Sequence, residues 1–209
     1  MRAVFDKLSP FVSKKPTDQG WHTIRFDAIA GLVSACNGID GCHVPASVGF
    51  TGIVSFHDLK RVVSKASDAT FSMPTPTAIV VQDAATTFRF KTLPSRAVAS
   101  LPEPPPDGWH TVSAEVIEAL QGAVEVSEAS PDPAGVRLQK SWAGGATGQM
   151  GLVVDTDAFG WLDKGVTVST SIIKSLSGEQ QVAKAFSRIW FTDSDGVILQ
   201  ERGRVRDRA

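Results

Sequence analysis

The segment Ile53-Val54-Ser55-Phe56-His57-Asp58-Leu59-Lys60-Arg61-Val62-Val63 reads as a short apolar strand that runs directly into a helix. Part of it, residues 54–60, returns later in the chain as Val168-Ser169-Thr170-Ser171-Ile172-Ile173-Lys174. Both copies begin with valine and serine and end with lysine. The recurrence predicts that a strand-to-helix element occurs twice in this protein.

Three more pairs of segments recur in the same order. Residues 4–12 match residues 116–124, Gly31-Leu32-Val33 matches Gly151-Leu152-Val153, and residues 80–83 match residues 190–193. Across all four pairs the spacing stays between 110 and 120 residues. Constant order and spacing are the signature of duplicated structural units, so we expect two copies of roughly 100 residues each.

The composition of the 209 residues is that of an ordinary soluble globular protein, with 42% hydrophobic and 21% charged residues. No apolar run approaches the roughly 20 residues that a membrane-spanning helix needs. The first residues lack the apolar core of a signal peptide. We therefore expect a cytoplasmic protein.

Charge is divided unequally between the two copies, although the net charge is only −1. Residues 1–96 contain 11 Lys and Arg against 7 Asp and Glu, whereas residues 97–209 contain 10 against 15. This asymmetry predicts a basic surface that is carried mainly by the first copy.

The hydrophobic patterns predict an α+β fold of two tandem copies of a β-α-β-β-β unit, with the helices on one face of antiparallel sheets. The first helix of each copy is expected at residues 3–12 and 114–126. Pro10 and Gly122 stand at equivalent places and are expected to bend both helices. Only the second copy has a strand ahead of its helix, at residues 109–113. Further strands are expected at residues 21–26, 31–36, 78–82, 86–91, 135–140, 150–155, 187–192 and 196–202.

The second helix of each copy has clear signals at its start. Asp58 places a negative charge near the N-terminus of the first of these helices, and Arg61 and Lys65 share its outward face. The apolar residues Leu59, Val62, Val63 and Ala66 are expected to face inward. In the other copy Ser171 is the candidate N-cap.

Residues 93–108 are predicted to connect the copies, because Pro102 and Pro104 to Pro106 favour an extended, semi-rigid path. The domain boundaries that follow are residues 1–94 for the first repeat, 95–108 for the connector and 109–209 for the second repeat. The last residues, 202–208, contain four arginines and form a basic tail, which is either a disordered end or an extra contact to phosphate or a partner.

No sequence motif of an enzyme is present. A nucleophile elbow and a phosphate-binding loop are both missing, and Gly144-Gly145-Ala146-Thr147-Gly148 lies between two strands, where it is expected to form a hairpin loop. The four histidines lack the spacing of metal ligands, and Cys36 and Cys42 are expected to be free thiols near a glycine-rich turn. We expect no catalytic residue, no metal and no cofactor.

Asp155 and Asp157 are the remaining candidates for a paired-carboxylate site. Asn37 takes the place of Asp157 in the other copy. A residue that forms a turn through its side chain explains both positions better than an acid–base pair does.

The tandem β-α-β-β-β pattern with a long connector resembles the DNA polymerase sliding clamps, which are ring-shaped processivity factors. The resemblance covers nearly the whole chain and is most specific at residues 53–63, where a strand enters the second helix. Residues 86–94 resemble a clamp closing strand that runs into the connector. Residues 116–120 and 151–157 resemble a clamp helix and a strand that ends in Asp.

The resemblance implies a ring whose helices line the central hole and whose sheets form the outer wall. Open strand edges of one copy pair with the next copy, which removes the exposed edges. In this family six units make a ring, so two units per chain imply a homotrimer. The short two-unit chain also suggests a phage-like or virus-type replication factor, which would work in the cytoplasm of the host cell.

In such a ring, Lys and Arg hold duplex DNA by its phosphates, without reading its sequence. The implied DNA-binding residues are Lys7, Lys14, Lys15, Lys60, Arg61, Lys65 and Lys174. The helix at residues 114–126 departs from this pattern, because it carries Glu115, Glu118 and Glu125 and no basic residue.

The resemblance also implies that a DNA polymerase and a clamp loader dock through a short hydrophobic peptide beside the connector. By position, Val98, Leu101 and Pro102 are the candidate partner-binding residues, although they could equally pin the connector to the sheet. Two alternatives to a DNA-encircling clamp stay open. One is an interaction or scaffold subunit with the clamp fold that does not encircle DNA by itself, and the other is an unrelated duplicated protein that binds a small ligand.

Overall fold

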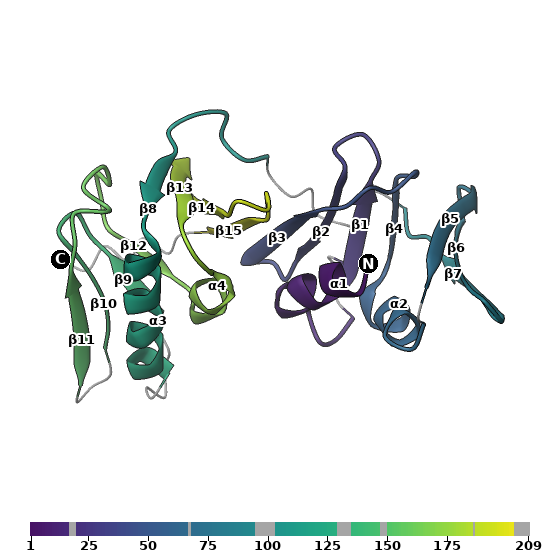
Figure 1. The fold of residues 1–209 in the computed structure, drawn as a ribbon, viewed down its shortest axis with the longest axis horizontal. Helices are drawn as coiled ribbons and strands as arrows, with labels where there is room; N and C mark the ends of the chain where they lie inside the picture. The colour runs from purple at the N-terminus through teal and green to yellow at the C-terminus, as the bar shows by residue number, and fades with distance from the viewer. Residues whose placement is uncertain are drawn as a thin grey trace. The chain divides into compact units, whose positions relative to one another are not determined.

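The protein is described by a computed structural model, which covers residues 1–16, 20–66, 68–94, 103–128, 135–146, 150–185 and 187–202. The chain divides into two compact units, Met1–Pro102 and Glu103–Ala209, and each is described here by itself (Figure 1). Within the described residues, no helix is long and apolar enough to cross a membrane.

The first unit contains two antiparallel sheets and two short helices. One sheet has the strand order β4-β1-β2-β3, from β1 (Thr23–Asp27), β2 (Leu32–Cys36), β3 (Asp40–Pro45) and β4 (Gly52–Ser55). The other has the order β5-β6-β7, from β5 (Thr70–Thr75), β6 (Ala78–Asp83) and β7 (Thr86–Lys91). The helices are α1 (Arg2–Leu8), which continues as the 3-10 turn η1 (Ser9–Phe11), and α2 (Phe56–Val63).

The second unit has the same plan with one additional strand. Its first sheet has the order β12-β9-β10-β11, from β9 (Val136–Leu138), β10 (Trp142–Ala146), β11 (Gly151–Asp155) and β12 (Val166–Val168). Its second sheet has the order β8-β13-β14-β15, from β8 (His110–Val112), β13 (Gln180–Ala185), β14 (Arg188–Thr192) and β15 (Ile198–Arg202). The helices are α3 (Ala114–Glu128) and α4 (Thr170–Ser175).

The strand orders of the two units correspond element by element, which confirms the duplication and the α+β class. Each unit has two helices, as the sequence predicted. The second unit contains the β-α-β-β-β motif twice, as β8-α3-β9-β10-β11 and as β12-α4-β13-β14-β15. The first unit repeats this order without a strand ahead of α1, as expected.

The cores form where helices cover the sheets with apolar side chains at helical spacing. In the first unit Phe5 and Leu8 of α1 and Phe56, Leu59 and Val63 of α2 are all buried. The rings of Phe5 and Phe56 lie 5.8 Å apart between their centroids. Burial of each such side chain contributes about 1.5–3 kcal/mol. The second unit repeats the pattern with Ile117, Leu120 and Val124 of α3 and Ile172 and Ile173 of α4.

One of the four matched segment pairs is wrong. Gly31-Leu32-Val33 leads into β2, whereas Gly151-Leu152-Val153 begins β11. By strand order β2 corresponds to β10, and β11 corresponds to β3. The sequences of these two segments therefore agree by chance, whereas the other three pairs lie on corresponding elements.

Glycine-rich stretches were the main source of error in the strand predictions. Gly144, Gly145 and Ala146 lie in β10 and not in a hairpin loop, and the stretch around Gly41 forms β3. The sequence also did not predict β5 in the first unit or β13 in the second.

The helix ends also differ in part from the predictions. Pro10 lies in the 3-10 turn where α1 ends, as expected for a bend, but α3 runs without interruption through Gly122. The N-cap of α4 is Ser169 and not Ser171, because the Oγ atom of Ser169 accepts a hydrogen bond from the backbone N–H of Ile172 at 3.4 Å. Val62 of α2 is only half-buried, unlike Leu59 and Val63.

Candidate nucleic-acid interface

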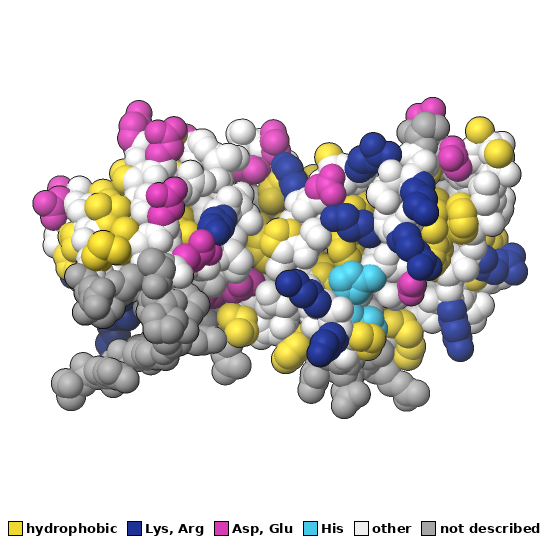
Figure 2. Space-filling model, turned by 90° about the horizontal axis from the view of Figure 1, so that it is seen from below, with side chains coloured by type: hydrophobic (Ala, Val, Ile, Leu, Met, Phe, Trp, Pro, Cys, Tyr) yellow, Lys and Arg dark blue, Asp and Glu magenta, His cyan; other side chains and the backbone are white. Residues whose placement is uncertain are grey.

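The basic residues of the first unit gather on the side of its helices. Figure 2 shows mainly Lys and Arg among the charged side chains over the first unit and mainly Asp and Glu over the second. Lys7 lies in the last turn of α1, and Lys14 and Lys15 lie in the exposed segment that follows η1. These three side chains are all exposed.

Contacts within the first unit hold the segment that carries Lys14 and Lys15. The Nε2–H of His57, on α2, donates a hydrogen bond of 2.8 Å to the backbone oxygen of Ser13. The hydroxyl of Ser13 donates one of 2.9 Å to the backbone oxygen of Lys15. This role of His57 is not visible in the sequence, since 44 residues separate it from Ser13.

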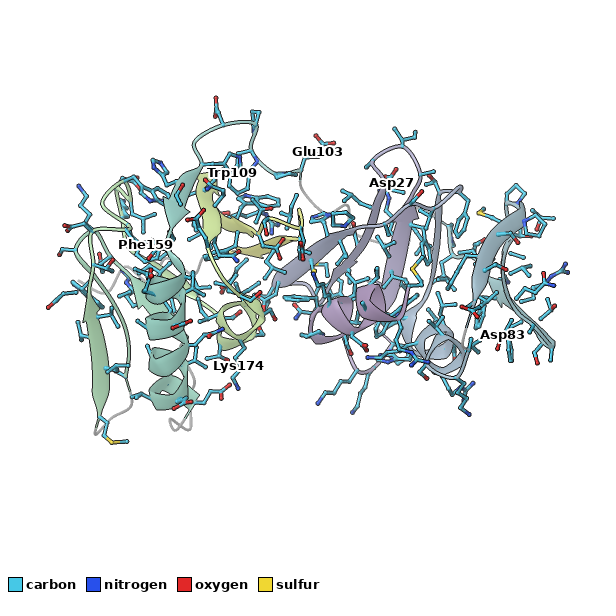
Figure 3. All side chains as sticks on the ribbon, viewed as in Figure 1. Asp27, Asp83, Glu103, Trp109, Phe159 and Lys174 are labelled. Atoms are coloured by element: carbon cyan, nitrogen blue, oxygen red, sulfur yellow. The ribbon has the colours of Figure 1, made fainter. Side chains whose placement is uncertain are left out.

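Lys60 and Lys174, which stand at equivalent places in the repeat, each bind a carboxylate of their own unit. The Nζ atom of Lys60 lies 3.2 Å from Oδ1 of Asp6 on α1, and that of Lys174 lies 2.6 Å from Oε2 of Glu128 on α3 (Figure 3). Each lysine therefore ties the second helix of its unit to the first. Each ammonium group is thus paired with a carboxylate, and contact of these two lysines with DNA stays a prediction.

Arg61 and Lys65 lie on the exposed side of α2 and just after it. The guanidinium of Arg61 is 74% exposed, and its nitrogen is 3.8 Å from Oδ1 of Asp58, which is too long for a hydrogen bond. Both residues line a groove of about 400 Å³ between α2 and β7, together with Phe88 and Arg89. The structure thus places them beside an edge strand.

Arg2 is a further basic residue of the first unit, at the start of α1. Its guanidinium donates hydrogen bonds to the backbone oxygens of Ser64, at 2.8 Å, and Ala66, at 3.3 Å, at the C-terminal end of α2. A cation at that end satisfies carbonyl groups that a helix leaves open and interacts favourably with its dipole. Its partners lie 62 and 64 residues away, so no local pattern could have revealed them.

The helix α3 confirms the acidic character expected from the sequence. Glu115, Glu118, Glu125 and Glu128 are exposed, while its inward side is apolar. A hydrogen bond from the side chain of Ser113 lowers the pKa of Glu115, which favours its charged form. The Lys174 ammonium binds Glu128, which leaves Glu118 and Glu125 as exposed charges at the middle of the helix.

Each unit has one strand edge with exposed apolar side chains. Among the described residues β7 pairs only with β6, and β11 pairs only with β10. Phe88 on β7 is 38% exposed, and Leu152 and Val153 on β11 are 37% and 62% exposed. Open strand edges of this kind are sites where another chain can add a strand.

The residues considered for other chemistry have structural roles. Asn37 forms the expected turn, since its Oδ1 atom accepts hydrogen bonds from the backbone of Ile39 and Asp40. Asp157 follows β11, which does not correspond to β2, so it is not the equivalent of Asn37, and its backbone oxygen accepts a hydrogen bond of 2.9 Å from the backbone N–H of Gly160. Cys36 and Cys42 are not joined by a disulfide, and the Sγ atom of Cys36 accepts a hydrogen bond of 3.3 Å from the backbone N–H of Gly38. Within the part of the chain that is described, no group of three His, Cys, Asp or Glu side chains could hold a metal ion.

The candidate partner-binding residues cannot be placed. Val98, Leu101 and Pro102 and the basic tail beyond Arg202 lie outside the described residues. At the end of the connector, the indole N–H of Trp109 donates a hydrogen bond of 3.1 Å to the backbone oxygen of Pro105.

No protein-family model matches this sequence, and no curated protein matches it. Solved structures do match its fold. The DNA polymerase sliding clamp from Bacillus subtilis superimposes with a TM-score of 0.80 and 11% identity, over 100% of this chain and 64% of that one. The Helicobacter pylori beta clamp bound to a DNA ligase peptide gives 0.79 and 11%, over 100% and 65%.

A third match is the DNA polymerase III beta subunit from Thermotoga maritima, with a TM-score of 0.75 and 13% identity over 100% of this chain and 63% of that one. The chain thus spans about 64% of the length of the clamps it resembles. At these identities the likeness concerns the fold. This protein has the sliding-clamp fold along its whole length.

Proposed function

We propose that this protein is a DNA sliding clamp, a ring-shaped processivity factor that encircles duplex DNA and tethers a replicative polymerase. The observation that carries the proposal is the match of the whole chain to the fold of bacterial sliding clamps. The proposal assigns the protein no catalytic residue and no cofactor.

The open edges of β7 and β11 support ring closure. Both edges carry exposed apolar side chains, and they belong to different units. When β7 of one copy pairs with β11 of the next, the contact is head-to-tail, and such contacts close into a ring if the rotation fits. With two units in each copy, a six-unit ring contains three copies, so the proposed assembly is a homotrimer.

The exposed lysines of the first unit support contact with DNA. Lys7, Lys14 and Lys15 can reach phosphate oxygens, which positions a duplex without reading its sequence. The proposed interaction is electrostatic, so affinity for duplex DNA falls as salt rises. The acidic face of α3 restricts the strongest DNA contact to the first unit.

The proposed partners are a DNA polymerase and a clamp loader, each of which docks by a short hydrophobic peptide. Support comes from the Helicobacter pylori beta clamp, whose structure contains a DNA ligase peptide. Val98, Leu101 and Pro102 stay the proposed lining of the docking groove. Substitution of Leu101 by Asp should abolish binding of such a peptide and leave assembly unchanged.

The first test is the mass of the protein in solution by light scattering, at several concentrations. The proposal expects a species of three times 22.2 kDa. The second test is retention on DNA, because a ring stays on closed circles and slides off linear duplexes with free ends. A trimer that is retained equally on both would contradict encirclement.

A second candidate function is a clamp-fold interaction or scaffold subunit that does not encircle DNA by itself. The acidic α3 favours this candidate, since carboxylates repel the phosphate backbone. It predicts a persistent monomer at all concentrations and no preference for circular DNA. The same two measurements therefore separate the two functions.

A further inference from the structure

We propose that Asp6 and Glu128 limit how tightly this protein holds duplex DNA, because each carboxylate occupies a lysine that would otherwise bind a phosphate. Asp6 acts on Lys60 in the first unit, and Glu128 acts on Lys174 in the second. This inference rests on the proposed function, in which the helices of each unit face the DNA. It gives two acidic residues a part in setting the strength of that contact.

The pair of the first unit joins its two helices. The Nζ atom of Lys60, in the last turn of α2, lies 3.2 Å from Oδ1 of Asp6 on α1. The same atom is 5.7 Å from the centroid of the Phe56 ring, a distance at which a cation is attracted to an aromatic face. Lys60 can therefore bind a phosphate only if it leaves Asp6 or shares its charge between the two anions.

The pair of the second unit follows the same plan. The Nζ atom of Lys174, in the last turn of α4, lies 2.6 Å from Oε2 of Glu128, the last residue of α3 (Figure 3). The two lysines are equivalent in the repeat. The repeat equivalent of Asp6, however, is Glu118 and not Glu128. The two units thus pair the same lysine with carboxylates from different positions on the first helix.

The stability of the helices does not explain where these carboxylates stand. Asp6 lies in the last turn of α1, and Glu128 ends α3. A negative charge near the C-terminal end of a helix interacts unfavourably with the helix dipole. Their side chains are 61% and 40% exposed, and ion pairs that are open to water contribute little to folding. What the carboxylates do change is the charge that the helices present.

Each pair reduces the attraction of its lysine for a phosphate. An ammonium and a carboxylate this close together act on a more distant phosphate as a dipole and not as a full positive charge. Affinity for duplex DNA comes from the release of counterions when cations neutralise phosphates. A lysine whose charge is already balanced adds less to this release. Both the affinity and its dependence on salt should therefore be lower with the carboxylates than without them.

A limited hold on DNA suits a ring that moves along the duplex. Phosphate contacts that are weak and independent of sequence let a protein slide along DNA. A closed ring stays on a circle by its shape, so retention does not require tight phosphate contacts. Carboxylates that weaken two of the contacts in each copy then favour movement without loss of the ring from DNA.

Removal of each carboxylate charge tests the inference. Asp6→Asn and Glu128→Gln keep the size of the side chain and remove its charge. We expect each substitution to raise the affinity for duplex DNA by roughly threefold or more at constant salt. The plot of log affinity against log salt should steepen by about 0.9 for each phosphate that a freed lysine binds. Fluorescence anisotropy measures both quantities, and circular dichroism and light scattering verify that each variant has the fold and mass of the unaltered protein.

A double-mutant cycle shows whether each carboxylate acts through its lysine. In a protein that already carries Lys60→Ala, the substitution Asp6→Asn should lose most of its effect, because no lysine is left to free. Lys174→Ala should do the same for Glu128→Gln. A gain of equal size with and without the lysine would mean that the carboxylate only repels phosphates, and this result would overturn the inference.

Asp163→Asn is the matched control. Asp163, in the loop between β11 and β12, binds Lys184 of β13, and neither residue lies on a helix. The substitution also removes one negative charge and leaves one lysine without its carboxylate. It should leave the affinity for DNA and the salt dependence unchanged. An equal gain in this control would show an effect of net charge alone and would also count against the inference.

The outcomes distinguish this inference from the proposed function. If the unaltered trimer is retained on circular DNA and neither Asp6→Asn nor Glu128→Gln raises the affinity, the inference is wrong and the clamp function stands. If the unaltered protein binds no duplex DNA even at low salt, both are wrong.

Discussion

At the scale of single residues, the most unusual ionisable side chain is His43, which lies in β3. Its Nδ1 atom is 2.9 Å from the hydroxyl of Ser34 on the neighbouring strand β2. Both side chains are buried. Burial disfavours the imidazolium form and lowers the pKa of His43 to about 4.

This pKa predicts that the protein loses stability in mild acid. Between the ordinary pKa of 6.5 and about 4 the unfolded chain binds a proton that the folded protein does not. The stabilisation that neutral His43 contributes to the folded protein is complete above pH 6.5. Between pH 6.5 and about 4 it falls by about 1.4 kcal/mol for each pH unit. Urea unfolding at a series of pH values should show this slope.

The variant His43→Gln is the control for this prediction. It keeps a polar side chain that can bond to Ser34 but has no charge to gain. In the variant, the free energy of unfolding should therefore depend less steeply on pH, by the amount that His43 contributes. Identical pH dependence in the two proteins would show that His43 does not titrate as described.

At the scale of elements, the sequence predicted the helices and their inward faces more securely than the strands. Leu59 and Val63 keep helical spacing because α2 must bury one side, and that spacing is visible in the sequence. The strand β10 was missed because Gly144 and Gly145 are typical of turns. A Cβ at Gly145 would overlap the backbone oxygen of Ala123 on α3. The glycine is therefore needed for a tertiary contact that only the folded unit reveals.

Two glycines of the second unit should respond oppositely to alanine. Gly145→Ala in β10 should lower the free energy of unfolding by about 1–3 kcal/mol, because α3 must move away. Gly122→Ala should raise it by about 0.5–1 kcal/mol, because alanine favours the helix and the new Cβ would lie 3.6 Å from Leu152, in ordinary contact. Thermal and urea unfolding of both variants measure the two changes. A destabilised Gly122→Ala would mean that α3 does bend there.

The candidate site shows the same limit of sequence reasoning. The sequence identified the basic and acidic helix faces, because charge is visible residue by residue. It could not show that Lys60 and Lys174 bind carboxylates on the neighbouring helix, since Asp6 and Glu128 are distant in sequence. Nor could it show that Arg61 and Lys65 share a groove with Phe88. These pairings depend on how the elements pack.

At the scale of the whole molecule, the division of charge between the units determines how it would hold DNA. A ring that contacts phosphates through Lys14 and Lys15 releases about 0.9 counterions for each phosphate it neutralises on duplex DNA. A plot of log affinity against log salt should therefore become shallower by about 0.9 for each contact removed. The variant with Lys14→Ala and Lys15→Ala should show this change without altered assembly, because neither residue lies at β7 or β11.

Lys164→Ala is the control, since Lys164 is exposed in the loop between β11 and β12 of the second unit. It removes one positive charge from each copy, where the double variant removes two, and it should leave the slope unchanged. Fluorescence anisotropy with a short duplex gives both slopes, and a second duplex of unrelated sequence should give the same values, because phosphate contacts carry no sequence information. A slope that changes by the same amount for each charge removed in both variants would indicate attraction by net charge, whereas a change confined to the Lys14 and Lys15 variant would locate DNA on the first unit.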